Sequence, residues 1–218
     1  MLRRLVAEFI GTAGLLTAVV GSGIMAERLT SDTAVVLLAN TIATAAALVA
    51  LIFTFRPISG AHFNPAVTLS AKLNGEIGLK DAGLYLFAQF SGALLGVGIA
   101  NLMFDLPFLF ASTKQRTGLS QWLGEFVATF GLVGVVHTCS RLQKSFVVPI
   151  VVASYITAAY WFTSSTSFAN PAVTVARSLS NTFAGIRPVD VTGFIVAQIL
   201  GALVASLVFS WLVPKEKE

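Results

Sequence analysis

Six long apolar segments, separated by short polar stretches, dominate the pattern of this chain. They lie at about 5–25, 33–54, 82–104, 121–139, 146–163 and 190–213. Each is close to the roughly 17–25 apolar residues that a helix needs to cross a hydrocarbon core. The pattern therefore predicts an all-α membrane protein with six transmembrane helices.

Two shorter apolar stretches, Val67–Leu73 and Val173–Leu179, each follow an Asn-Pro-Ala tripeptide: Asn64-Pro65-Ala66 and Asn170-Pro171-Ala172. Asn at the N-cap with Pro at the first helical position is a strong signal for a helix start. A helix of about 10 residues is roughly 15 Å long, which is half of a ~30 Å hydrocarbon core. Broken helices at that depth are tolerated only where they line a cavity or are buried in protein. We therefore expect two re-entrant half-helices at a pore or a transport site.

The chain also contains an internal repeat, with two spans, a half-helix and a third span in each half. Three pairs of matching residues, at offsets of 117, 106 and 109, mark it: Glu8 and Glu125, Asn64 and Asn170, Gln89 and Gln198. Because each half has an odd number of spans, the halves must be inverted relative to one another in the membrane. We expect one channel domain over 1–218, with repeats at approximately 1–110 and 117–218.

Composition supports the membrane assignment, since 56% of the 218 residues are hydrophobic and only 11% are charged, against about 25% charged in a soluble domain. The single cysteine, Cys139, excludes an internal disulfide and a zinc site built on paired cysteines. No phosphate-binding loop, nucleophile elbow or metal-ligand cluster is present. We expect no enzyme activity, no catalytic residues, no metal and no cofactor. The first span contains Glu8 and lacks a clear cleavage site, so we interpret it as retained.

The distribution of Lys and Arg predicts the orientation in the membrane. With the N-terminus inside, nine of the fourteen basic residues fall on the cytoplasmic side and five outside. An excess of Lys and Arg marks the cytoplasmic side. We expect a multi-pass protein of the inner (plasma) membrane with both termini cytoplasmic. The net charge of +4 reflects this topology and not a nucleic-acid partner.

Asn64 and Asn170 are the first candidates for contact with a solute. As N-caps they turn their side-chain oxygens to their own half-helices, which leaves the amide NH₂ groups free to donate into a lumen. The two helix N-termini add partial positive charge of about +0.5 each at the midplane. Such a lumen favours neutral hydrogen-bonding solutes and opposes cations and protons. The alternative is that both residues only cap their helices.

Three motifs together resemble the major intrinsic proteins, the aquaporin and aquaglyceroporin family. They are Ser59-Gly60-Ala61-His62-Phe63-Asn64-Pro65-Ala66-Val67-Thr68, the second Asn-Pro-Ala, and the paired segments around Glu8-Phe9 and Glu125-Phe126. The resemblance covers essentially the whole chain. It implies six tilted helices plus two half-helices, a homotetramer with one pore per subunit, and passive conduction of water or small uncharged solutes. The implied partners are those solutes and the lipid bilayer.

The resemblance also gives a role to the two carboxylates within apolar spans, which are costly in lipid and need an explanation. Acids at these positions of the family accept hydrogen bonds from the re-entrant loops. Glu8 would support the first loop near His62, and Glu125 would support the second. The rival interpretation is proton coupling through both residues.

The resemblance also implies a four-residue selectivity filter. When its positions are transferred by their spacing from the two tripeptides, they fall on Thr44, Ala158, Ser167 and Val173. The family usually has Arg at the position of Val173, together with aromatic residues or His at the others. All four residues here are small or medium in size, so we expect a wide and weakly polar aperture. Ser167 stands where mercury-sensitive members carry Cys, which predicts a channel that mercurials do not inhibit.

Arg177 lies four residues after Val173, on the same helix face and about 6 Å further outward. We expect it at the pore mouth, where it would concentrate oxyanions or polar solutes; the alternative is an arginine that snorkels at a helix end.

The sequence Asn-Pro-Ala-Val-Thr-Val-Ala-Arg that ends at Arg177 resembles a bacterial branch found alongside arsenic-resistance genes, which implies passage of arsenite, an uncharged As(OH)₃, or of methylated arsenicals. Three alternatives remain: a general channel for glycerol and water, a proton-coupled secondary transporter, and a structural membrane protein with a closed pore.

Overall fold

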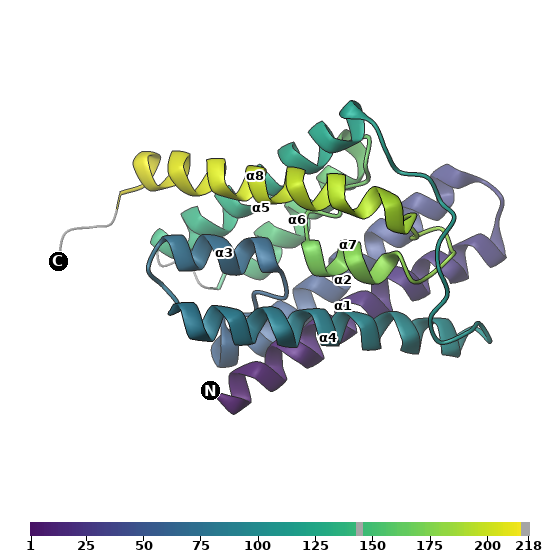
Figure 1. The fold of residues 1–218 in the computed structure, drawn as a ribbon, viewed down its shortest axis with the longest axis horizontal. Helices are drawn as coiled ribbons and strands as arrows, with labels where there is room; N and C mark the ends of the chain where they lie inside the picture. The colour runs from purple at the N-terminus through teal and green to yellow at the C-terminus, as the bar shows by residue number, and fades with distance from the viewer. Residues whose placement is uncertain (143–145, 215–218) are drawn as a thin grey trace.

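The structure, a computed structural model, describes residues 1–142 and 146–214, and all regular secondary structure in this part of the chain is helical (Figure 1). In chain order the elements are α1 (Leu2–Leu29), α2 (Thr33–Ser59), α3 (Pro65–Leu73), α4 (Leu79–Met103), α5 (Leu119–Arg141), α6 (Val148–Phe162), α7 (Pro171–Arg177), a short 3₁₀ turn (Pro188–Asp190) and α8 (Val191–Leu212). Each predicted apolar segment corresponds to one helix, and each Asn-Pro-Ala begins one of the two short helices.

Five helices in the described residues are long and apolar enough to cross a membrane: α1, α2, α4, α5 and the segment Pro188–Leu212 that contains α8. The helix from the predicted segment 146–163 is shorter. It begins at Val148, next to Pro149, and ends at Phe162, where Thr163 adopts an extended conformation. Its 15 residues give a length of roughly 22 Å. A run of Thr and Ser after residue 162 therefore replaces the last helical turns of this span.

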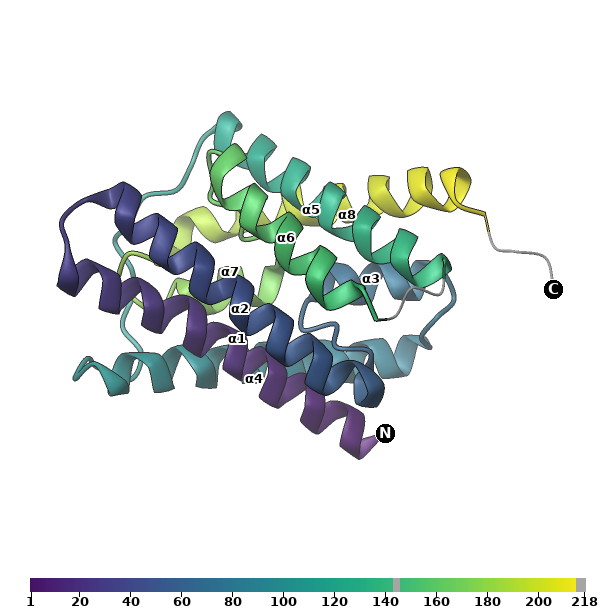
Figure 2. The same ribbon diagram turned by 180° about the vertical axis from the view of Figure 1, so that it is seen from behind.

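Glycines let the long helices approach closely at equivalent points of the two repeats. A Cβ atom at Gly92 of α4 would collide with the carbonyl oxygen of Phe9 in α1. A Cβ atom at Gly201 of α8 would meet the carbonyl oxygen of Phe126 in α5. Small residues at such crossings allow backbone-to-backbone packing between helices in lipid. The pair α1–α4 in the first repeat and the pair α5–α8 in the second therefore pack in the same way. The two helices of each pair run side by side in Figures 1 and 2.

The two short helices begin near each other in the middle of the molecule and point to opposite ends (Figure 1). Asn64 caps the nine-residue α3, accepting a hydrogen bond from Ala66 N at 2.8 Å. Asn170 caps the seven-residue α7, accepting from Ala172 N at 3.0 Å and Val173 N at 3.2 Å. The predicted helix starts are confirmed, and both helices are shorter than the expected 10 residues.

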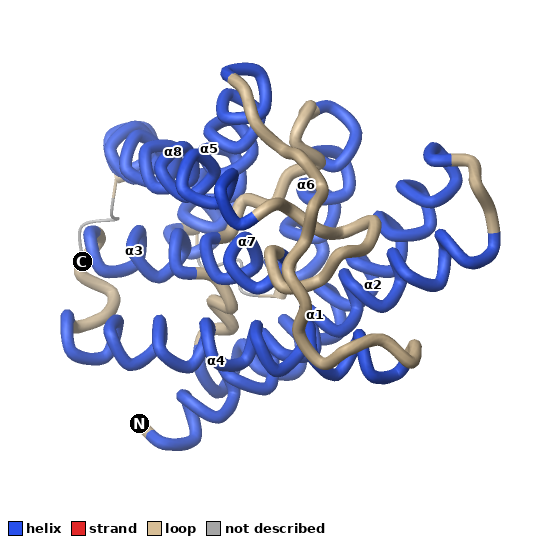
Figure 3. The backbone as a smooth tube through the Cα atoms, turned by 45° about the vertical axis from the view of Figure 1, so that its right-hand side comes forward, coloured by secondary structure: helices blue, strands red, loops and turns tan. Residues whose placement is uncertain are grey.

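Met1 and the last turn of α8 lie at the same end of the helix bundle (Figures 1 and 2). The turn between α1 and α2 and the long loop between α4 and α5 lie at the opposite end. Figure 3 shows this loop crossing over α7 beside the segment that follows α7. We call this end the outer end, and the end with Met1 the inner end.

Candidate pore

A cavity of about 680 Å³ runs through the centre of the bundle. At the inner end it is lined by Arg56, Glu76, Ser140 and Phe146, and at the outer end by Thr44, Tyr160, Ser167, Val173 and Arg177. Between them it passes Asn64 and Asn170, the caps of the two half-helices. The cavity therefore crosses the level at which both half-helices begin.

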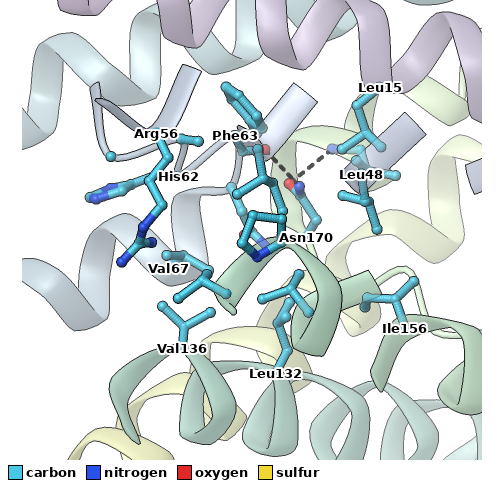
Figure 4. A pocket seen from close by; sticks show the side chains of 18 of the residues that line it. Leu15, Leu48, Arg56, His62, Phe63, Val67, Leu132, Val136, Ile156 and Asn170 are labelled. Carbon is cyan, nitrogen blue, oxygen red and sulfur yellow. Dashed lines mark hydrogen bonds between the residues drawn. The ribbon is translucent and has the colours of Figure 1, made fainter. Parts of the chain in front are cut away.

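Apolar side chains make up much of the cavity wall, and polar groups come mainly from the re-entrant loops (Figure 4). Leu132 and Val136 from α5 and Ile156 from α6 line one side of it. The backbone of the first re-entrant loop, with His62, lies on the other side. The cavity lining therefore combines apolar side chains with a few hydrogen-bonding groups.

The two half-helices are joined at the midplane by a reciprocal pair of hydrogen bonds. Asn64 Nδ2 donates to Ala169 O at 2.7 Å, and Asn170 Nδ2 donates to Phe63 O at 2.8 Å, the latter drawn in Figure 4. The sequence predicts that both amide NH₂ groups are free to donate into a lumen. That prediction is wrong for one N–H of each amide, because each Asn also fastens the loop of the other repeat. One N–H of each NH₂ group remains for a solute.

The re-entrant loops adopt unusual backbone conformations at matching positions. Three pairs, each 106 residues apart, have positive φ: Gly60 and Thr166 (89° and 60°), Ala61 and Ser167 (52° and 51°), Phe63 and Ala169 (49° and 48°). A residue other than Gly in such a conformation costs on the order of 1–3 kcal/mol and persists where its surroundings hold it. The loops therefore need a support that offsets this cost.

Glu8 and Glu125, both fully buried, lie where they can provide that support. Glu8 accepts from His62 N at 3.0 Å and from Phe63 N at 2.7 Å. Glu125 accepts from Phe168 N and Ala169 N, both at 2.8 Å. Hydrogen bonds from backbone N–H groups to a carboxylate are about twice as strong as those between neutral groups.

Two glutamines complete this arrangement, and the sequence reveals them only as a repeated residue without a role. Gln89 Nε2 donates to Glu8 Oε2 and to Thr68 Oγ1, both at 2.9 Å. Gln198 Nε2 donates to Glu125 Oε2 at 2.6 Å and to Thr174 Oγ1 at 2.8 Å. The Thr partners lie on α3 and α7, so each glutamine ties a half-helix to the carboxylate of its own repeat. The available signal was the recurrence of Gln after the half-helix in both repeats, at an offset of 109 residues.

The outer end of the cavity contains three of the four residues at the predicted filter positions. Thr44, Ser167 and Val173 line it, whereas Ala158 is exposed on the outside of α6. The prediction for Ala158 is wrong because α6 presents Val152, Ile156 and Tyr160 to the cavity. These residues are four apart and share one helix face, while Ala158 lies about 200° around the helix from its neighbours on that face.

Tyr160 consequently gives the outer end an aromatic residue that the sequence did not predict. Its hydroxyl donates to Thr44 Oγ1 at 3.2 Å. Tyr160 thus lines the same cavity as the small side chains of Ser167 and Val173.

Arg177 is buried, with 3% of its surface exposed, and it lines the cavity. Its Nε donates to Ala184 O, and its Cζ lies 3.4 Å from the ring centroid of Phe168. A snorkelling arginine would extend its charged group into water, which this burial does not allow. The structure therefore places Arg177 at the outer part of the cavity wall, one turn beyond Val173.

A second arginine, Arg116 from the α4–α5 loop, also lies over Phe168, with its Cζ 5.0 Å from the ring centroid. It donates to Gly185 O at 2.8 Å and to Ser165 O at 3.2 Å. Burial lowers the pKa of the Arg116 guanidinium to about 10, so the group stays charged at neutral pH. Sequence reasoning missed Arg116, because nothing in the sequence brings the α4–α5 loop to the second re-entrant loop.

Cys139 is buried in α5 and is not among the cavity-lining residues, whereas Ser167 is. We therefore expect water permeability to be unaffected by a mercurial in the wild type. Ser167→Cys is expected to become sensitive, losing more than half of its permeability in a stopped-flow assay and recovering it with a thiol reductant. Strong inhibition of the wild type that Cys139→Ser relieves would contradict the assignment of Ser167.

A cavity that crosses the level of two opposed half-helices, within an all-helical membrane fold, defines a membrane channel. A family model described as "Major intrinsic protein" matches residues 1–167. The chain is 56% identical over 210 residues to aquaglyceroporin AqpS of Rhizobium meliloti (strain 1021), covering 96% of this chain and 90% of that protein. The chain belongs to the major intrinsic protein family, whose members are channels and not enzymes.

Further comparisons extend this similarity. Over 217 residues the chain is 30% identical to a probable aquaporin of NIP type from Nicotiana alata, covering 96% of this chain and 79% of that protein. The fold matches the X-ray structure of the aquaglyceroporin from Plasmodium falciparum with a TM-score of 0.71, over 98% of this chain and 97% of that one. At 19% identity this likeness concerns the fold alone.

Proposed function

We propose that the chain is a passive aquaglyceroporin-type channel for small uncharged solutes, among them arsenite or methylated arsenicals, glycerol and water. One observation carries the proposal: the central cavity passes both Asn-Pro-Ala helix starts and reaches an outer end with Val173 where the family usually has Arg. Val173 adds neither charge nor a long side chain there. The similarity to a protein named an aquaglyceroporin supports a channel that passes more than water.

The midplane would select for neutral solutes. Asn64 and Asn170 each keep one N–H for a passing oxygen, and the two helix N-termini add positive potential at the same level. Arsenite in the form As(OH)₃ and glycerol both present hydroxyl groups without a charge, so the same hydrogen-bonding groups can serve either. In the same proposal Glu8 and Glu125 support the loops, and His62 lines the inner half of the path.

The whole chain forms one channel domain in this proposal, and four copies assemble into a homotetramer in the plasma membrane. Both termini face the cytoplasm, because nine of the fourteen Lys and Arg residues then lie on the cytoplasmic side, as expected for a membrane protein. This topology is supported by the position of Met1 and the last turn of α8 at the same end of the bundle.

Stopped-flow measurements on purified protein in liposomes test the proposal. We expect water, glycerol and arsenite to pass faster than in empty liposomes, and a protonophore to leave the rates unchanged. A proton-coupled transporter would lose its uptake with the protonophore, and a closed structural protein would pass no solute. A pore that passes water alone would retain the family assignment and overturn the proposed solute range.

A further inference from the structure

Arg177 has hydrogen-bond donors that the protein itself does not use. Its Nε is bonded to Ala184 O, and within residues 1–142 and 146–214 we find no hydrogen bond from its two terminal nitrogens. Because Arg177 lines the cavity, these donors lie at the cavity wall. A guanidinium offers five N–H donors in a planar fork, a geometry that matches a carboxylate or another oxyanion.

The positive charge around Arg177 is not balanced by ion pairs. In the described part of the chain neither Arg177 nor Arg116 forms a salt bridge with a carboxylate, although both are buried at 3% and 6% exposure. Glu125 acts on both electrostatically, but its oxygens accept from Phe168 N, Ala169 N and Gln198 Nε2. Buried charges are usually paired, because an unpaired one is costly. The shared ring of Phe168 offsets only part of this cost.

Ser167 provides a second, independent observation. The residue is buried, with 2% of its surface exposed, and its Oγ has no hydrogen-bond partner in the described residues. It lines the same cavity as Arg177, from the loop that precedes α7. A buried hydroxyl without a partner costs free energy unless a ligand or water completes its hydrogen bonding. The cavity wall therefore offers a cationic fork and a hydroxyl, both unoccupied by protein groups.

We propose that Arg177 and Ser167 form a binding site for a small oxyanion at the outer end of the pore, and that a bound anion obstructs the passage of neutral solutes. The anion is a carboxylate or a tetrahedral oxyanion, small enough for the space that Val173 leaves open. Phe168 holds Arg177 in place through the face of its ring, and Arg116 adds a second positive charge over the same ring. The obstruction rests on the proposed channel function, whereas the binding does not.

Thermal unfolding of the purified full-length protein in detergent tests binding alone. Sodium formate and inorganic phosphate are the probes, compared with sodium chloride at equal ionic strength. We expect a saturable rise in the melting temperature, since a ligand that binds only the folded state stabilises it. Arg177→Gln and Ser167→Ala should each reduce the rise by more than half. Arg28→Gln is the control and should retain the rise, because Arg28 is an exposed arginine in the last turn of α1, at the outer end of the bundle.

Glycerol efflux from liposomes tests obstruction, with the probe added at saturating concentration on the outer face. We expect the probe to lower the glycerol efflux rate saturably, by at least twofold, in the wild type and in Arg28→Gln. In Arg177→Gln the efflux rates with and without the probe should be nearly equal. Glycerol conduction with no anion effect in either assay would overturn the site and leave the channel intact. An Arg177-dependent rise in melting temperature without any conduction would overturn the channel and the obstruction, and leave the binding site.

If Arg177→Gln does not fold, Ser167→Ala alone decides between these outcomes, because it removes only one hydroxyl. An equal rise in melting temperature for both variants and the wild type would mean that the anions act on the protein generally, which overturns the site.

Discussion

Val173→Arg is expected to lower glycerol and arsenite permeability by at least about tenfold, which corresponds to a barrier higher by roughly 1.4 kcal/mol. Val173 lines the cavity one turn before Arg177, on the same face of α7. A guanidinium there would extend toward Tyr160 and narrow the aperture that the small side chains leave. Water, being smaller, should lose less. Side-by-side stopped-flow measurements of the three solutes check this.

Val173→Leu is the matched control, since it adds one methylene without a charge. We expect it to reduce glycerol permeability by less than threefold. If Val173→Arg leaves the glycerol rate unchanged, the constriction lies elsewhere, and the apolar wall of Leu132 and Val136 is the next region to vary.

Glu125→Gln is expected to destabilise the folded protein and to abolish most of its permeability. The amide oxygen can still accept from Phe168 N or Ala169 N, but its NH₂ group cannot, so a buried backbone donor loses its partner. Such a loss costs about 1–3 kcal/mol, and it removes support from a loop with strained residues at 166, 167 and 169. The melting temperature should fall by about 2–4 °C for each kcal/mol in a chain of this length.

Glu8→Gln should have the same effect in the other repeat, because its carboxylate accepts from equivalent backbone groups. Glu27→Gln is the control: Glu27 accepts from one backbone donor, Phe183 N, near the outer surface. If Glu125→Gln kept the wild-type melting temperature and lost only a dependence on the proton gradient, its carboxylate would be a proton carrier and not a support.

The sequence predicts the elements of this fold well because the membrane imposes simple rules. Apolar length identifies the spans, and Asn followed by Pro identifies the starts of α3 and α7. The repeat of Glu, Asn and Gln indicates that equivalent residues make equivalent contacts, although it left the partners of the two glutamines unidentified. These signals depend on local chemistry or on internal comparison, and both are visible in a single sequence.

The filter was harder to predict because it depends on helix rotation and on loops. Ala158 was placed by spacing alone, and spacing does not show which face α6 turns to the cavity; Tyr160, two residues later, occupies that face. Arg116 reaches Phe168 from a loop whose path no local signal determines. The use of one amide N–H of each Asn across the repeat boundary also requires the three-dimensional meeting of two loops.

The reciprocal hydrogen bonds at the midplane make the two halves of the chain depend on each other in the bilayer. Phe63 O is satisfied by Asn170, and Ala169 O by Asn64, so each half of the chain completes the backbone of the other. A half inserted alone would expose an unpaired carbonyl and an unpaired amide at the depth where water is absent and such groups cost several kcal/mol each. Neither half is a complete subunit by itself. A mutation that displaces one Asn-Pro-Ala tripeptide also breaks the hydrogen bond that it makes to the loop of the other half.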